Sequence, residues 1–254
     1  GIRDVAVTGV QTCALPISAF SLSLSPELAV GMLFLCTLPA TVQSAIAFTA
    51  MARGNVAAAV CSASASSLIG VLVTPLLVNW LVVPGGMAGG DAWNAVLHIM
   101  EQLLLPFALG QLLQPWVGGF VKRHANTLRM VDQSSILLVV YTAFSAAVIE
   151  GLWSRVPVLT LLVLVAACCV LLALVLAITT WGSRALGFSP EDQITIVFCG
   201  SKKSLASGVP MAKVLFSAPQ VGMMLLPLML FHQIQLMVCA VLAQRYGKRP
   251  ESSL

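Results

Sequence analysis

The chain has 254 residues, of which 59% are hydrophobic and only 9% are charged. A soluble domain carries far more charge on its surface, so this composition excludes a water-soluble globular protein and indicates an integral membrane protein. The formal net charge of +4 does not predict a nucleic-acid partner, because the basic residues lie in short connections between apolar segments, where membrane lipid and topology explain them.

The first residues, GIRDVAVTGVQTCALPIS, differ in character from the rest of the chain. They lack an initiator Met and the continuous apolar core of a signal peptide. This peptide resembles translated adapter sequence of the kind found at the broken ends of assembled reads. We therefore expect residues 1–18 to be non-native or unstructured, and the membrane domain to occupy residues 19–254.

The run SPELAVGMLFLCTLP opens with a helix-start pattern, in which Ser25 is the N-cap and Pro26 the first helical residue. It reaches Pro39 after about half of the ~20 residues that a helix needs to cross a bilayer. The run TVQSAIAFTAMARG then continues it. A proline frees backbone carbonyls that must find partners inside the protein, so we predict one spanning segment that is broken at residues 38–41, with Pro39 and Thr41 in the break.

Six further apolar segments follow the broken one. They cover residues 55–82, 93–121, 130–150, 156–181, 191–216 and 221–246. A long apolar run such as LTLLVLVAACCVLLALVLAITTW exceeds the ~20 residues of a membrane helix, whereas barrel strands would be ~10-residue alternating segments. The sequence predicts an all-α membrane protein, a polytopic helical bundle with about seven transmembrane spans.

The basic residues divide unequally between the two sides that alternating loops define. One side receives Arg53, Lys122, Arg123, Arg129, Arg184, Arg245, Lys248 and Arg249, and the other only Arg155 and Lys213. The basic side of a membrane protein is cytoplasmic, so we expect a multi-pass protein of the cell membrane with its C-terminus in the cytoplasm. All five tryptophans fall at segment ends, where indole rings favour the membrane interface.

Two adjacent lysines, Lys202 and Lys203, lie near the middle of the segment EDQITIVFCGSKKSLASGVPMAKVLF. A lysine at the bilayer centre costs on the order of 3 kcal/mol, so this pair is expected to face protein or water. The neighbours Gly200, Ser201 and Ser204 are weak helix formers, which predicts a second broken helix. The alternative is a misplaced boundary, with both lysines reaching the interface from a shallow segment.

Two interrupted membrane helices are typical of a secondary transporter, in which half-helix ends line a site at the membrane midplane. Residues 92–247 would form a complete five-helix repeat with a broken fourth member. Residues 19–82 would then be the end of a first repeat, and three helices would be missing before them. In the last segment, His232 lies mid-span with Gln233 and Gln235, where a structural hydrogen-bonded pair is favoured over an ion relay.

Enzymatic and metal-binding chemistry find little support. The seven cysteines show neither CxxC nor metal-ligand spacing, so we expect no disulfide framework, no metal site and no cofactor. Ser201 or Ser204 with a lysine base would still need an oxyanion site and orienting groups that the sequence does not reveal.

The stretches LPATVQSAIAFTAMARGNVAAAVCSASASSLIGVLVTPLL, LLPFALGQLL and TIVFCGSKKSLASGVPMA resemble the bile acid:sodium symporter family, in particular its divergent SBF-like branch. The resemblance implies ten helices in two inverted repeats, with a panel domain that moves against a core whose fourth and ninth helices are broken and cross. It also implies, for sodium-coupled members, two Na⁺ sites beside this crossing.

The sodium ligands of the family match this sequence poorly. The family's Ser-Asn pair falls on Ala45 and Ile46. Its Ser and Thr on the next helix fall on Ala59 and Ala63, and its Glu and Gln in the second broken helix fall on Val197 and Ser201. A small shift of register would instead bring oxygens from Gln43, Ser44, Thr49, Ser62 and Ser64. An ammonium of Lys202 or Lys203 is a third candidate, as an attached substitute for the cation.

We therefore expect a secondary active transporter of a small organic, anionic solute that works by alternating access. Its coupling ion would be H⁺, because a buried lysine can release its proton, or Na⁺ at shifted sites, or transport would be uncoupled. The alternative is a non-transporting membrane regulator on the same fold.

Overall fold

The computed structural model describes residues 25–81, 90–149, 151, 156–216 and 218–249. Within these residues it contains nine α-helices and no strand, as expected of an all-α protein. In chain order the helices are α2 (Pro26–Thr37), α3 (Val42–Met51), α4 (Val56–Leu81), α5 (Gly90–Arg123), α6 (Ala125–Ile149), α8 (Val158–Ala185), α9 (Pro190–Gly200), α10 (Leu205–Leu215) and α11 (Ala218–Gly247). The segment expected to be non-native, residues 1–18, lies outside the described residues.

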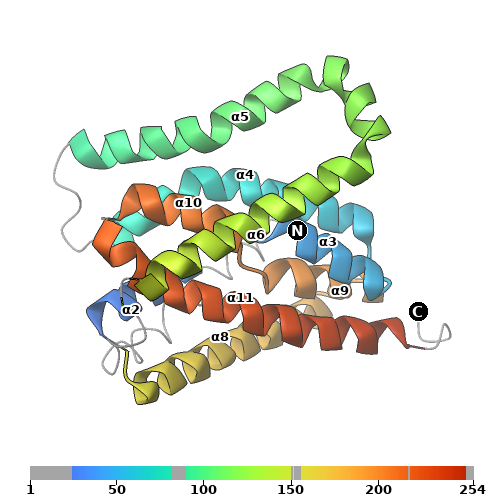
Figure 1. Ribbon diagram of the computed structural model, residues 1–254. Coiled ribbons are helices and arrows are strands. Elements are labelled where there is room, and N and C mark those ends of the chain that lie inside the picture. Colours follow the sequence, from blue (N-terminus) through green and yellow to red (C-terminus); the bar gives the residue numbers. More distant parts are fainter. Residues whose placement is uncertain (1–24, 82–89, 150, 152–155, 217, 250–254) are drawn as a thin grey trace.

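The helices form a packed body with one outlying pair. Figure 1 shows α5 along the top of the molecule, α6 running from its end back across the front of the bundle, and α8 and α11 along the bottom. Helix α5 contacts α4 and α10, and α6 contacts α10 and α11. Helices α2, α3, α9 and α10 lie between, so that the short interrupted helices occupy the interior of the bundle.

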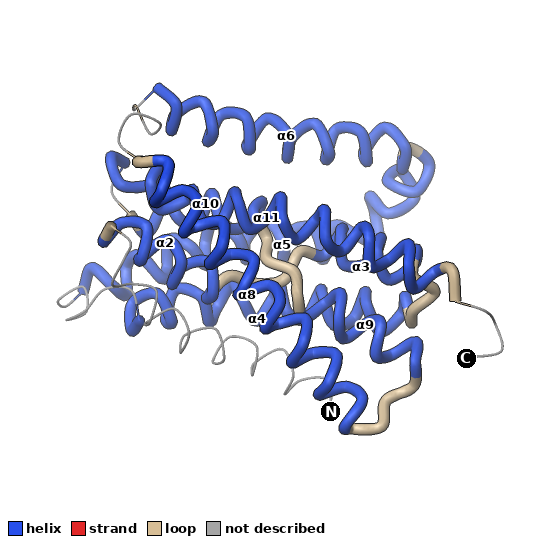
Figure 2. Tube along the Cα trace, turned by 90° about the horizontal axis from the view of Figure 1, so that it is seen from below, coloured by secondary structure: helices blue, strands red, loops and turns tan. Residues whose placement is uncertain are grey.

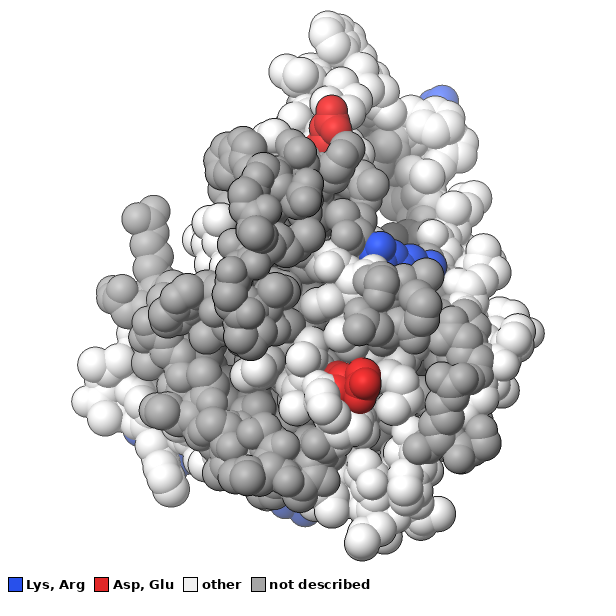
Figure 3. Space-filling model, turned by 90° about the vertical axis from the view of Figure 1, so that its left-hand side faces the viewer, with Lys and Arg blue, Asp and Glu red and all other residues white. Residues whose placement is uncertain are grey.

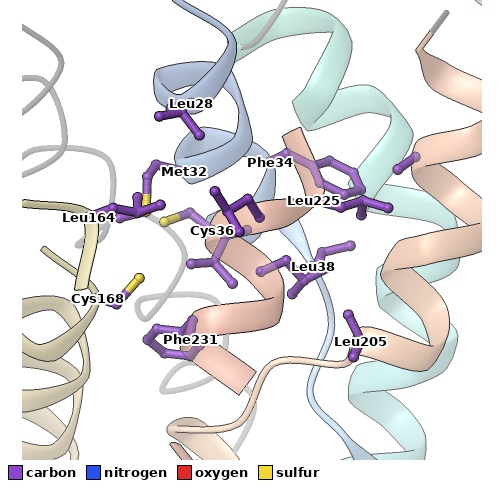
Figure 4. Close-up of a cluster of buried hydrophobic side chains, with 14 of the residues drawn as sticks. Leu28, Met32, Phe34, Cys36, Leu38, Leu164, Cys168, Leu205, Leu225 and Phe231 are labelled. Carbon is purple, nitrogen blue, oxygen red and sulfur yellow. The ribbon is translucent and has the colours of Figure 1, made fainter. Parts of the chain in front are cut away.

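The main apolar core joins α2, α8 and α11 (Figure 4). Phe34 and Leu164 are both 0% exposed and belong to this cluster. At Gly31, an added Cβ would lie 2.4 Å from the backbone oxygen of Met224, so the backbones of α2 and α11 touch here and leave no room for a side chain. Close contact at small residues is how membrane helices associate without a hydrophobic driving force.

Two breaks interrupt the helices at equal length. Residues 38–41 separate α2 from α3, and residues 201–204 separate α9 from α10, four residues in each case. Helices α2 and α3 meet at a bend of 62°. Pro39 is buried against α4, where a Cβ on Gly70 would lie 2.4 Å from the proline ring, so the small-residue helix α4 accommodates the break.

By length and composition, two described helices can cross a membrane, α8 and residues 221–247 of α11. The bent pair of α2 and α3 makes a third if it counts as one span. The class of helical membrane protein therefore stands, while the count of seven spans remains a prediction. Among the described residues visible in Figure 3, the charged side chains are separated from one another by uncharged surface.

One end of the molecule collects the ends of α3, α8 and α11 together with the start of α9 (Figure 1). Arg184 and Arg245 lie in the last turns of α8 and α11, and Arg53 follows α3 with a left-handed φ of 59°. Asn55, next along this turn, donates to Asp192 Oδ1 at 2.9 Å and caps α4 through Ala58 N. The turn between α3 and α4 is thus tied to the first turn of α9.

Candidate functional site

The two breaks lie against each other in the middle of the bundle (Figure 2). The backbone N–H of Ser204 donates to Pro39 O at 3.0 Å, and the hydroxyl of Thr41 donates to Lys203 O at 2.8 Å. Thr41 is the N-cap of α3, yet its hydroxyl makes no capping bond, because it is directed to the other break. The interrupted helices therefore meet through backbone groups that an unbroken helix would use internally.

The carbonyls at the end of α2 and in its break find donors from three parts of the chain. The bonds run from Thr37 Oγ1 to Phe34 O (2.8 Å), from Leu38 N to Leu35 O (3.4 Å), from Thr74 Oγ1 to Thr37 O (2.7 Å), from Lys203 Nζ to Cys36 O (2.9 Å) and Leu38 O (3.0 Å), and from Ser204 N to Pro39 O (3.0 Å). A helix end buried in the membrane requires such complete pairing. Helix α4 and the second break supply most of it.

Lys203 provides the only cationic donor in this set. Its ammonium lies at the C-terminal end of α2, where aligned peptide dipoles give the carbonyls a partial negative charge. Hydrogen bonds from a charged donor are roughly twice as strong as neutral ones. The half-buried lysine therefore both satisfies and neutralises the end of this half-helix.

The peptide of Lys203 is itself clamped by Gln235 of α11, which is 0% exposed. The carboxamide oxygen of Gln235 accepts from Lys203 N at 2.9 Å, and its nitrogen donates to Lys203 O at 2.9 Å. Nδ1 of His232 lies 3.3 Å from the same carbonyl and 2.9 Å from the Gln235 nitrogen. The Gln235 carboxamide pairs with the N–H and carbonyl of Lys203 as the backbone of an adjacent strand would, and residue 203 is non-helical.

Lys202 has different surroundings. It is only 1% exposed, and its ammonium has no oxygen or nitrogen partner among the described residues. The nitrogen lies 4.0 Å from the centroid of the Phe48 ring, a cation–π geometry, and near the thiol of Cys239, whose sulfur is a weak acceptor. Lys202 is thus a buried cation that the structure leaves without a counter-charge.

An aromatic cluster separates Lys202 from the end of the molecule where α11 ends. Phe48 packs against Phe198, with ring centroids 6.1 Å apart, and Phe198 packs edge-on against Tyr246 at 6.0 Å. The exposed Arg249 lies over the Tyr246 ring at 4.2 Å. Access to Lys202 from this end would require these three rings to move.

The positions that the family resemblance assigns to sodium ligands form an apolar cluster. Ala45, Ala59 and Ala63 are each 0% exposed and pack together with Cys199. Alkali ions bind oxygen atoms such as carbonyls, and methyl groups offer none. Ser201, at the position of the family's Gln, is buried with its hydroxyl 3.8 Å from Cys239 Sγ. The carried-over set therefore presents mainly methyl groups where oxygens would be needed.

The alternative oxygens are only partly turned inward. Gln43 and Ser64 are exposed, and Ser62 is half-buried beside Cys199. Thr49 is 0% exposed, and both its hydroxyl and the buried hydroxyl of Ser44 lack a hydrogen-bond partner within the described part of the chain. Among these five residues, only Ser44 and Thr49 hold an unengaged polar atom inside the protein.

The two serines of the second break have structural partners. Ser204 is the N-cap of α10, and its hydroxyl accepts from Ser207 N at 3.2 Å. Gly200 is the last residue of α9, and Ser201 follows as its C-cap. The Ser201 hydroxyl lies against Cys239 Sγ, and the Ser204 hydroxyl donates to Ser207 Oγ at 3.0 Å.

Sequence reasoning did not identify Thr74 as part of this site, and it named Gln235 only as a structural hydrogen-bonding partner of His232. The signal for Gln235 was its place in the middle of the apolar run LPLMLFHQIQLMV, where a carboxamide needs a partner. Ser66, which is set apart from the other serines of α4 because it shares a helix face with Asn55, accepts from Ala40 N at 3.4 Å, in the first break.

Paired broken helices with lysine side chains at their meeting point are typical of secondary transporters. The model of the SBF-like CPA transporter family matches residues 6–248, and the chain belongs to this family. The resemblance to the bile acid:sodium symporter family is thereby confirmed.

Three relatives illustrate the range of similarity. The chain is 66% identical over 235 residues to "Uncharacterized protein PA2026" of Pseudomonas aeruginosa, covering 92% of this chain and 70% of that protein. It is 58% identical over 229 residues to "Putative symporter YfeH" of Escherichia coli, covering 90% and 68%. It is 26% identical over 222 residues to "Sodium/bile acid cotransporter 7" of Rattus norvegicus, covering 87% and 65%. The chain thus spans about two thirds of the length of these relatives.

Proposed function

We propose that the protein is a secondary active transporter of a small organic anion that works by alternating access. The observation that carries this proposal is the unpaired ammonium of Lys202, buried beside the meeting point of two broken helices. A buried cation without a counter-charge is costly, and such residues in membrane proteins mark solute or ion pathways. A carboxylate or sulfonate of the solute supplies the missing charge when the crossing opens.

The coupling ion in this proposal is not sodium at the family's usual positions. The cluster of Ala45, Ala59 and Ala63 supports this, because it offers no oxygen ligands. Instead a proton, carried by Lys202, accompanies the anion, or transport is uncoupled. Ser44 and Thr49 keep a second route open, since their unengaged hydroxyls are the inward oxygens of α3.

We propose the cell membrane as its location, with the basic end of the molecule in the cytoplasm. The gathering of Arg184 and Arg245 at one end supports this orientation. A fluorescent or enzymatic reporter fused after residue 254 is expected to be active only in the cytoplasm. An exported, periplasm-active reporter would reverse the orientation.

Uptake into vesicles tests the transport proposal. The full-length protein is reconstituted and given labelled taurocholate and then a panel of smaller organic carboxylates and sulfonates, under an inward Na⁺ gradient, an acid-outside gradient, or neither. We expect saturable uptake of at least one anion that the Na⁺ gradient does not accelerate, and a loss of at least about tenfold in Lys202→Gln, roughly the 1.4 kcal/mol of one lost charged contact. Lys248→Gln, the same substitution at an exposed position, is the matched control.

The same experiment separates the second candidate, a non-transporting membrane regulator. The alanine cluster favours it, because a protein that has lost its ion ligands has lost a usual means of driving transport. No saturable uptake of any anion by a folded preparation would support the regulator and contradict transport. Sodium-driven uptake would contradict the proposed coupling alone.

A further inference from the structure

Lys203 occupies a position where a free cation would otherwise be required. Helix α2 ends at Thr37, and Pro39 has no N–H with which to continue the hydrogen bonding. The last carbonyls of a helix lie beyond its own N–H groups, and Ala40 N, four residues after Cys36, donates to Ser66 Oγ. The oxygens of Cys36 and Leu38 both receive the Lys203 ammonium, at 2.9 and 3.0 Å.

Two converging backbone carbonyls at the negative end of a half-helix are the chemistry that transporters use to hold a monovalent cation. A primary ammonium carries the same single charge and brings three donors. It is attached to the chain, so it need not be bound from solution. The contacts of Lys203 thus reproduce those of a bound cation without requiring one.

The attachment is rigid at its base. Gln235 holds both the N–H and the carbonyl of Lys203, and Thr41 donates to the same carbonyl. These three hydrogen bonds to the N–H and carbonyl of Lys203 fix the position of its backbone, and the ammonium is directed at α2. The neighbouring Lys202 is directed elsewhere, with its ammonium over the Phe48 ring of α3.

We infer that Lys203 is a built-in cation of the helix crossing. Its ammonium permanently fills a monovalent-cation position formed by the Cys36 and Leu38 carbonyls, and the crossing consequently assembles without a metal ion. Removing the side chain opens a latent site for a small primary ammonium ion. This inference concerns assembly of the crossing and does not rest on the proposed transport.

Chemical rescue tests this inference. Truncation in Lys203→Ala removes three carbons and the nitrogen, which is the size of n-propylammonium. We expect Lys203→Ala, purified as the full chain, to melt about 5–10 °C below the wild type, because two charge-assisted bonds are lost. Added n-propylammonium chloride is expected to restore much of this loss with saturation, as a ligand of the native state does.

The controls distinguish a specific site from a general salt effect. Tetramethylammonium chloride at equal ionic strength, which cannot donate hydrogen bonds, is expected to give no recovery. The wild type and Lys202→Ala are expected to show no response to n-propylammonium, because neither has the vacancy. Recovery with tetramethylammonium, or equal response of Lys202→Ala, would overturn the inference.

A second variant covers the case in which Lys203→Ala does not fold. Lys203→Met keeps most of the aliphatic stem without the charge, and Lys203→Arg keeps the charge with a different geometry. We expect Lys203→Met to melt several degrees below both the wild type and Lys203→Arg, about 3–8 °C for bonds of this strength. A Lys203→Met protein as stable as the wild type would show that the charge is not needed, and the inference would fail.

Discussion

The two helix breaks have the same length and opposite chemistry. Each spans four residues and ends in a hydroxyl-bearing N-cap, Thr41 in the first and Ser204 in the second. The first break presents carbonyl oxygens around a buried proline, and the second presents a lysine ammonium and backbone N–H groups. The first break acts mainly as an acceptor and the second mainly as a donor, although Thr41 of the first break also donates to Lys203 O of the second.

This complementarity explains how polar backbone is tolerated inside an apolar bundle. Pro39 interrupts the helical hydrogen bonding of the first break, and most of the carbonyls there take their donors from other segments. Gln235 hydrogen-bonds the backbone of Lys203 in the second break. The Lys203 ammonium and the N–H of Ser204 donate to carbonyls of the first break. Each variant below removes one part of this arrangement, beginning with the largest expected effect.

The clamp on Lys203 is expected to matter most. Gln235→Leu keeps the volume but leaves a buried N–H without its partner and weakens the bonding of a buried carbonyl, which costs about 1–3 kcal/mol for each group. We expect the melting temperature to fall by about 10 °C or the folded yield to collapse, measured by thermal unfolding in detergent. Gln233→Leu, on an exposed face of the same helix, is the control. Equal behaviour of the two variants would refute the clamp.

The contact between Pro39 and Gly70 of α4 is expected to have the second largest effect on stability. Gly70→Val places a side chain where even a Cβ would lie 2.4 Å from Pro39, and overpacking of this kind costs about 1–3 kcal/mol. Melting is expected at a temperature lower by about 3–8 °C. Gly182→Val in α8, where a Cβ meets nothing within 4 Å, should lose much less. A tolerant Gly70 would mean that the break does not depend on close contact with α4.

The direct bond between the breaks has a smaller effect. Thr41→Val removes the hydroxyl that donates to Lys203 O and keeps the shape of the side chain. Because Gln235 still donates to that carbonyl, we expect a loss of about 1 kcal/mol, or roughly 2–4 °C in melting temperature. Ser64→Ala, at an exposed position of α4, should be neutral. A Thr41→Val protein with unchanged stability would remove this bond from the account.

The positions of both breaks were predictable because their signals are local. Pro39 forbids continuous helical bonding, and glycine and serines around Lys202 weaken it, so the sequence alone indicates where the helices stop. The different roles of Lys202 and Lys203 were not predictable. These roles depend on which of the two lysine side chains faces α2. That choice follows from the hydrogen bonds between Gln235 and the backbone of Lys203, which are 32 residues apart in sequence.

The other candidate oxygens show the same limit. Gln43, Ser62 and Ser64 qualified by residue type, yet helix rotation leaves Gln43 and Ser64 exposed. Ser66 is chemically identical to Ser64 and lies at the break, because two residues along a helix turn the side chain by about 200°. Composition therefore identified the right segment, while packing decided which of its side chains reach the site.

The most direct test of the division between the lysines is to measure the melting temperatures of Lys202→Met and Lys203→Met side by side. The account predicts opposite signs. Lys203→Met loses two bonds to carbonyls and melts lower, whereas Lys202→Met removes an unpaired buried cation and is neutral or more stable, by up to about 1 kcal/mol. Equal destabilisation by both variants, or a larger loss of stability in Lys202→Met, would contradict the claim that Lys203, and not Lys202, stabilises the crossing of the two breaks.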